Sequence, residues 1–187
     1  MTNLYLHSAG AVNSARGDGA ASWDEPGAEP PDKFDYDPDA PVPTRGGGKL
    51  LPPSGSIAQN DGEERADVLV YTSEVLKADL EVTGPLSAVI YAASSAQDTD
   101  FTAKLVDLYP DGQAVLINDG IIRARFRDGR DKPALIEPGQ VYEYTNDPWC
   151  TSNVFLQGHR LRGKSAPPTS PAASAIRTWA VCPAIPG

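Results

Sequence analysis

Residues 66–95 read "ADVLVYTSEVLKADLEVTGPLSAVIYAASS" and contain three segments with the patterns of β-strands. "ADVLVYTS" (66–73) carries apolar side chains on both faces, which is typical of a strand in the middle of a sheet. "DLEVTGP" (79–85) alternates instead, with Leu80 and Val82 expected inside and the polar residues between them outside. "LSAVIYAASS" (86–95) follows directly after a proline. Strands this closely spaced predict an all-β fold.

The segments that follow continue the same pattern. "FTAKLVDLY" (101–109), "QAVLIND" (113–119), "GIIRARFRD" (120–128) and "QVYEYTND" (140–147) are separated by turn-forming clusters such as "PDG" and "EPGQ". We expect Phe101, Ala103 and Leu105 to face the core, and Asp111 and Gly112 to reverse the chain. Short strands at this spacing, without segments of helical period, predict a jelly-roll β-sandwich.

The composition bounds the class of protein. The chain has 187 residues, a formal net charge of −9, 18 prolines and 17 glycines. This length suits one domain, and the negative charge argues against nucleic-acid and anionic-membrane partners, because both need clustered lysine and arginine. No segment reaches membrane-spanning length and no export signal opens the chain, so we expect a cytoplasmic location. The two cysteines, Cys150 and Cys182, define neither a disulfide framework nor a metal site.

A long arm precedes the strands. Residues 3–7, "NLYLH", alternate like a short strand, and a polar, Gly- and Pro-rich passage runs from there to about residue 64. Its prolines exclude a regular central ladder, so we expect the arm to lie over something larger. The predicted organisation is an N-terminal strand and arm (1–64), a β-sandwich core (65–162) and an irregular tail (163–187).

The sequence contains no catalytic motif. The pentapeptide G-x-S-x-G of α/β-hydrolases is absent, and "GSI" at residues 55–57 lacks the second glycine. A Ser-His-Asp arrangement would have to use His7 or His159. Each of these is expected at a strand edge, where a structural histidine bonded to the backbone is the stronger interpretation. We therefore predict no catalytic residue in this chain.

Three polar motifs have both a functional and a structural interpretation. The carboxylates of Asp32, Asp35, Asp37 and Asp39 could hold calcium, but they lack an EF-hand loop, so we favour a solvated acidic loop and predict no metal or cofactor. In "IIRARFR", alternation places Arg123, Arg125 and Arg127 on one face, either as an anion site or, as we favour, paired with acidic neighbours. "GGGK" at residues 46–49 follows no strand and is interpreted as a linker, not as a phosphate-binding loop.

Several stretches together resemble a known family. "LYLHSAG" (4–10), "PPDKFDYDPDAPVPT" (30–44), "NDGIIRARFRD" (118–128), "EPGQVYEYTNDPW" (137–149) and "TSNVFLQGHRLR" (151–162) are similar to the C-terminal domain of X-Pro dipeptidyl-peptidases and cocaine-esterase-type serine hydrolases. The resemblance spans residues 4–162. It implies a galactose-binding-like jelly roll that carries no triad residue and packs on an α/β-hydrolase catalytic domain, and it leaves a homo-oligomer open.

A second function from another class remains open. A free-standing carbohydrate-binding jelly roll would need an exposed aromatic platform, for which Trp23 and Trp149 are available. Both tryptophans lie in motifs that the hydrolase resemblance already covers, so we favour the accessory domain of a serine peptidase or esterase.

The tail, "GKSAPPTSPAASAIRTWAVCPAIPG" (163–187), has no hydrophobic period. Members of the resembled family typically continue after "GHRLR" with a pattern like "EISSSNFPRFDRNPNTGG". A one-base shift after Arg162 permits much of that pattern from the codons of residues 163–171 and 174–180. We infer a frameshifted tail, the alternative being a genuine disordered extension. Its prolines predict that it cannot replace the closing strands, which leaves the sandwich incomplete at this end.

Overall fold

The computed structural model of the chain describes residues 2–37, 39–50, 52–166 and 173–181, and of the last range only the backbone. Within these residues the fold consists of β-strands and two single helical turns, α1 (Asn60–Glu63) and the 3-10 turn η1 (Ala124–Phe126). The strands are β1 (Thr2–His7), β2 (Ala20–Ser22), β3 (Leu69–Ser73), β4 (Leu80–Pro85), β5 (Ser87–Ala93), β6 (Asp100–Leu108), β7 (Ala114–Arg123), β8 (Tyr142–Asn146), β9 (Cys150–Phe155), β10 (Arg160–Ser165) and β11 (Ala173–Val181). No helix in this described part is long and apolar enough to cross a membrane.

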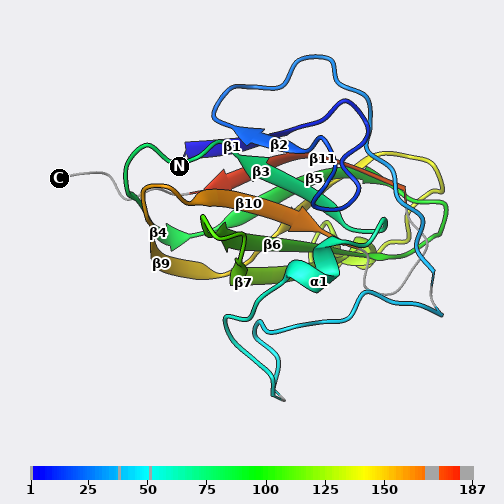
Figure 1. Cartoon of the computed structure of the whole chain (residues 1–187). Coiled ribbons are helices and arrows are strands. Elements are labelled where there is room, and N and C mark those ends of the chain that lie inside the picture. The colour runs from blue at the N-terminus through cyan, green and yellow to red at the C-terminus, as the bar shows by residue number, and fades with distance from the viewer. Residues whose placement is uncertain (1, 38, 51, 167–172, 182–187) are drawn as a thin grey trace.

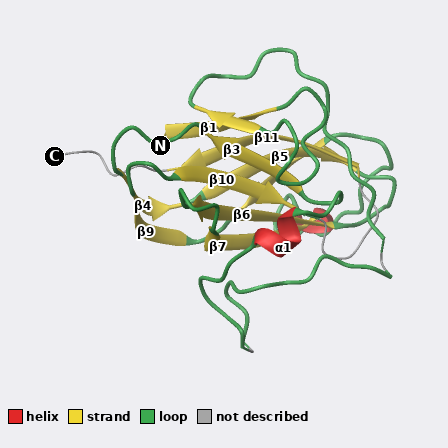
Figure 2. Ribbon diagram, in the orientation of Figure 1, coloured by secondary structure: helices red, strands yellow, loops and turns green. Residues whose placement is uncertain are grey.

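Nine strands form one sheet, in the order β7-β6-β10-β3-β2-β1-β11-β5-β8, and β4 pairs with β9 in a second, two-stranded sheet. The β2–β3 pair is parallel, and the other ladders are antiparallel. The large sheet curls, so that β7 and β8, which stand at opposite ends of its strand order, contact each other. The strands thereby form stacked layers (Figures 1 and 2), which confirms the predicted all-β sandwich.

The core lies between these layers and follows the predicted pattern. Phe101, Ala103 and Leu105 are each 1% exposed, and the ring centroid of Phe101 lies 4.6 Å from that of Tyr144 on β8. After β6, the Gly112 amide donates to the Tyr109 carbonyl, as expected for the predicted reversal. Strand β3 is buried on both faces and β4 on one, because β3 lies inside the large sheet whereas β4 belongs to the small one.

Two predicted strands are a single strand in the structure. Residues 113–119 and 120–128 were expected to be separate, yet β7 continues through Gly120 and ends at Arg123. The pairing of β7 with β6 accommodates the extra length through a register shift at Leu105 and Val106. The chain then turns into η1. Arg123 therefore lies on β7, Arg125 lies in η1 and Arg127 follows η1, so the three arginines do not share one strand face as predicted.

The N-terminal arm lies over the sandwich of its own chain. Strands β1 and β2 are part of the large sheet, and Phe34 and Tyr36 from the proline-rich passage are buried. Asp32 is also buried and accepts a hydrogen bond of 2.7 Å from the hydroxyl of Tyr71 on β3. The arm therefore contributes side chains to the folded domain.

The structure differs from the predicted irregular tail. Strand β10 continues to Ser165, and β11 is inserted between β1 and β5. The prolines that argued against a strand, at positions 167, 168, 171, 183 and 186, lie outside the described residues, whereas residues 173–181 contain none. A proline-free stretch can supply the amides that a central strand needs. The closing position of the sheet is therefore occupied, and the frameshift itself stays a prediction.

Candidate functional site

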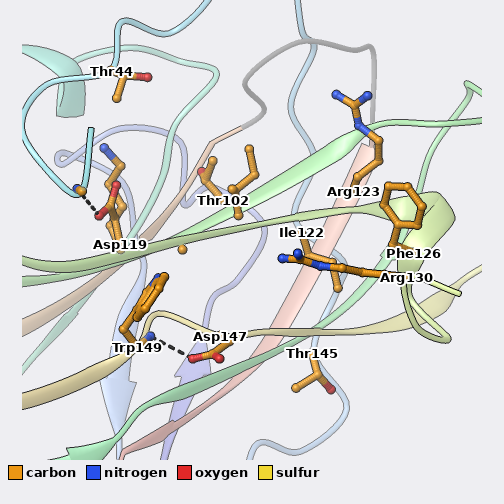
Figure 3. A pocket seen from close by; sticks show the side chains of 14 residues that line it. Thr44, Thr102, Asp119, Ile122, Arg123, Phe126, Arg130, Thr145, Asp147 and Trp149 are labelled. Carbon is orange, nitrogen blue, oxygen red and sulfur yellow. Dashed lines mark hydrogen bonds between the residues drawn. The ribbon is translucent and has the colours of Figure 1, made fainter. Parts of the chain in front are cut away.

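A groove of about 590 Å³ lies where the two ends of the large sheet meet. Residues of β6 and β7, the loop at Thr44 and Gly48, and the connection from β8 to β9 line it (Figure 3). The lining side chains combine apolar, cationic and acidic groups and belong to Thr44, Gly48, Thr102, Lys104, Asp119, Gly120, Ile121, Ile122, Arg123, Phe126, Arg130, Thr145, Asp147 and Trp149.

One rim of the groove is a glycine-rich hairpin. Gly47 and Gly55 pair through two backbone hydrogen bonds of 2.8 and 2.9 Å, and the Gly48 amide donates to Asp119 Oδ1 at 3.2 Å. Gly47 has a φ of +75°, and a Cβ there would lie 2.3 Å from Asp119 Oδ2, so any other residue would be strained and would have to displace the Asp119 side chain. The motif interpreted as a linker is thus attached to β7 and extends away from the sandwich, at the bottom of Figure 1.

The opposite rim is the connection from β8 to β9. The side-chain amide of Asn118 on β7 donates to the carbonyls of Pro148 and Cys150, at 3.0 and 3.1 Å. Gly120 permits this close approach, because a Cβ there would lie 2.3 Å from Asn146 Oδ1. The connection is therefore held on β7 at several points.

Trp149 stands on this rim and is 76% exposed. Its φ is +71°, a left-handed conformation that is unusual for a large side chain. Two hydrogen bonds of 2.9 Å hold it there, since its amide donates to Asp147 Oδ1 and its carbonyl accepts from the Leu86 amide. Figure 3 shows the indole beside Asp147 at one side of the groove.

One cation of the groove forms an ion pair, and a second lies near an acidic group. Arg123 donates from Nε and Nη2 to the two oxygens of Asp100, at 2.7 and 2.8 Å, and this pair raises the pKa of Arg123. Burial lowers the pKa of Lys104, which the nearby Asp119 carboxylate opposes. The groove therefore presents a mixed surface and not a cluster of free cations.

The other two arginines of the motif are also engaged. Arg125 Nε donates to Asp98 at 2.6 Å, and Arg127 lies over the Tyr142 ring, with its Cζ 4.4 Å from the ring centroid. The favoured interpretation, pairing with acidic neighbours, is confirmed for Arg123 and Arg125. Arg127 also has an acidic neighbour, with its Nε 3.5 Å from Asp128 Oδ2, and it donates to the carbonyls of Ala124 and Ala134, at 3.3 and 2.7 Å.

The groove lacks the groups that covalent or general-base catalysis uses most. No serine, cysteine or histidine is among the residues that line it in the described part of the chain. Threonine, carboxylate and ammonium groups are present, and the Thr102 hydroxyl donates to the Ala166 carbonyl at 2.6 Å. A lining of apolar groups and charges of both signs suits a binding surface instead.

Both histidines are bonded to side chains rather than to the backbone. His159 Nδ1 lies 2.9 Å from Asp107 Oδ1, and its ring stacks against Tyr109 with 4.5 Å between centroids. His7 lies between Ser22 and Glu29, with Nε2 3.0 Å from Ser22 Oγ and Nδ1 2.9 Å from Glu29 Oε1.

The hydrogen bonds that link Ser22 to His7 and His7 to Glu29 match the connectivity of a serine hydrolase triad. No local sequence motif marks this cluster, because its three residues come from separate segments. The Asp24 amide also donates to Ser22 Oγ, at 3.1 Å, so this hydroxyl closes the turn after β2. The Ser8 amide donates to Glu29 Oε2 at 3.0 Å. We interpret the cluster as a structural tie between β1, β2 and the arm.

The acidic residues of the arm do not converge. Asp32 points inward to Tyr71 and Ser8, whereas Asp37 accepts from the Asp39 amide at 2.9 Å and Asp35 is exposed. Among the described residues, no group of three or more acidic, histidine or cysteine side chains could hold a metal ion. Cys150 is an exposed free thiol, and Cys182 lies outside the described residues.

The two tryptophans proposed for a carbohydrate platform are not together. Trp23 lines a second groove, of about 740 Å³, with Ser22, Val75 and Leu76, and Trp149 lines the first. The grooves share no lining residue.

These observations define a class of protein: an all-β accessory domain with a binding groove and without the nucleophilic serine motif of a hydrolase. The chain belongs to the family described as the X-Pro dipeptidyl-peptidase C-terminal non-catalytic domain, which matches residues 2–162. It is 48% identical over 162 residues to the cocaine esterase of Rhodococcus sp. (strain MB1 Bresler), a match that covers 86% of this chain and 28% of that protein.

Solved structures agree with this assignment. An aminopeptidase from a marine sediment Thaumarchaeota archaeon matches with a TM-score of 0.76 and 26% identity, over 92% of this chain and 30% of that one. An α-amino acid ester hydrolase matches with a TM-score of 0.75 and 22% identity, over 93% of this chain and 30% of that one, which supports the fold. The chain thus spans less than a third of the length of these proteins.

Proposed function

We propose that this chain acts as the C-terminal, non-catalytic domain of a serine hydrolase that cleaves ester or X-Pro peptide bonds, packing on the catalytic domain and supporting its cleft. The observation that carries the proposal is the family match over residues 2–162, which covers nearly all of the patterned sequence. The groove supports it, because its lining offers apolar contacts and charges of both signs but no serine, cysteine or histidine.

The carbohydrate-binding alternative gains no support from these findings. Trp23 and Trp149 line separate grooves and cannot form one aromatic platform. The relatives described above are named as an esterase, an aminopeptidase and an ester hydrolase.

Co-expression with a truncated relative tests the proposal. The Rhodococcus cocaine esterase, shortened by the region that matches this chain, is produced alone and together with the tagged 187-residue chain. We expect the two to co-purify and the soluble yield and ester hydrolysis of the shortened enzyme to rise. If the chain neither co-purifies nor changes the yield or activity, the supporting role is contradicted.

Two further properties stay predictions. A homo-oligomer would show as a doubled mass in light scattering, and a cytoplasmic location can be tested by fractionating cells.

A further inference from the structure

The exposed apolar side chains of this domain are unevenly placed. Among the described residues, the three most exposed large hydrophobic side chains are Leu50 at 97%, Trp149 at 76% and Ile121 at 60%. Ile121 and Trp149 line the groove, and Leu50 lies two residues after Gly48, which lines it as well. Other exposed apolar side chains, such as Val141 at 59% and Leu135 at 55%, lie outside this groove, but Trp149 and Ile121 are the two most exposed large hydrophobic side chains that line either groove. Strongly exposed apolar groups beside a groove mark an interaction surface.

The local backbone keeps Trp149 in place. The left-handed conformation of Trp149 has an energetic cost, yet Asp147, Leu86 and the Asn118 side chain together hold the connection that carries it. A tryptophan presented on a fixed backbone beside a groove is the kind of side chain that dominates the binding energy of protein interfaces.

We propose that this groove, with Trp149 and Ile121 in its lining, is the surface that docks on the catalytic domain. The inference rests on the proposed function and specifies which face makes the contact. The partner follows from the comparisons: the chain spans 28% of the cocaine esterase and 30% of the aminopeptidase, so most of each relative lies outside the matched region. A lining that combines exposed apolar side chains with charges of both signs fits a folded protein surface better than a small anion.

The second groove is the competing face. It is larger, about 740 Å³ against 590 Å³, but its apolar rim residues are less exposed, with Trp23 at 47% and Val75 at 44%. The second groove lies at the end of β2 and β3. It provides a matched control for substitutions, because each groove has one exposed tryptophan in its lining.

The first experiment compares Trp149→Ala with Trp23→Ala. Each full-length variant is titrated calorimetrically against the Rhodococcus cocaine esterase that lacks its matching region. We expect Trp149→Ala to weaken binding about tenfold or more, as truncation of a central interface residue does, and Trp23→Ala to leave it unchanged. Thermal melting should be the same for both variants and the wild-type chain, because both indoles are exposed. Ile121→Ser provides a second substitution at the same rim and should also weaken binding.

A footprint on the unmodified groove provides a test independent of the tryptophan substitution. Cys150 is exposed and adjacent to Trp149, so in a Cys182→Ser background it is the single thiol of the chain. We expect the shortened esterase to slow maleimide labelling of Cys150 severalfold. As the control, a Cys150→Ser, Cys182→Ser, Val75→Cys variant carries its single thiol in the second groove. The shortened esterase should not change the rate of maleimide labelling at position 75.

The outcomes separate this proposal from the previous one. If the wild-type chain binds but Trp149→Ala and Ile121→Ser bind equally well and Cys150 stays unprotected, the docking face is elsewhere and the supporting role stands. Loss of binding in Trp23→Ala, with protection at position 75, would identify the second groove instead. If the wild-type chain does not bind, the docking surface and the supporting role are both contradicted.

Discussion

Lys164 gives the sharpest test of the energetics of this fold. It lies near the end of β10, 3% exposed, where its Nζ donates to Gln59 Oε1 at 3.2 Å and stands 4.0 Å from Glu63 Oε1. That carboxylate oxygen is buried and has no hydrogen-bond partner among the described residues. Burial lowers the pKa of Lys164 from its ordinary 10.5 to about 8, in spite of the opposing attraction of Glu63.

The sign of the pH effect follows from this lowered pKa. Between pH 8 and 10.5 the unfolded chain binds the proton of Lys164 more completely than the folded chain does, so stability rises with pH over this window. Below pH 8 the folded state carries the full cost of the buried charge, about 3 kcal/mol. By pH 9 about 1 kcal/mol of that cost should be recovered.

Urea unfolding of the wild-type chain and of Lys164→Met at pH 7 and pH 9 measures this contribution. Other groups titrate in the same range, so the informative quantity is the difference in free energy of unfolding between the two proteins. We expect it to move by about 1 kcal/mol in favour of the wild-type chain as the pH rises. Lys77→Met, at an exposed lysine, is the matched control and should run parallel to the wild-type chain. If Lys164→Met also runs parallel, Lys164 is not buried as a charged group.

Four other predictions address the core, the chemistry, an ion pair and the tail. Leu105→Asp should lower the free energy of unfolding by about 4 kcal/mol, and a variant that melts with the wild-type chain would place Leu105 outside the core. The chain should hydrolyse neither X-Pro p-nitroanilides nor short-chain esters; turnover abolished both by a serine-directed phosphonate and by Ser22→Ala would contradict this. Arg123→Ala should cost about 2 kcal/mol in urea unfolding because it leaves the buried Asp100 without its bidentate partner, and Arg123→Lys should restore only part of that stability. Truncation after Ser165, which removes β11, should lower the melting temperature because β1 and β5 lose the strand between them, and an unchanged melting temperature would argue against β11.

Much of the fold was predictable from local pattern. Alternation along a strand reports which side chains face the core, so Val82, Phe101 and Leu105 could be assigned to it before any partner strand was known. The absence of a nucleophile motif and the family resemblance likewise depend on residues read in order. Strand alternation and sequence motifs extend over only a few residues, so they can be recognised in one segment without knowing its partners in the fold.

The candidate site could not be predicted in this way. Its two rims come from segments about 100 residues apart, the glycine hairpin near Gly48 and the connection at Trp149, which meet only because the large sheet curls until β7 reaches β8. The glycines at 46–48 and the tryptophan after "NDP" were visible signals, but nothing local indicates that they border one groove.

The sequence by itself determined the class of fold, the inward faces of most strands and the lack of a catalytic motif, because alternation and motif spacing act over a few residues. The tertiary structure decided the partners. It paired Arg123 with Asp100, joined Ser22 to His7 and Glu29, and inserted β11 between β1 and β5. Hydrogen bonds and ion pairs form between groups that the folded chain brings within about 3 Å, and that proximity depends on the path of the whole sheet.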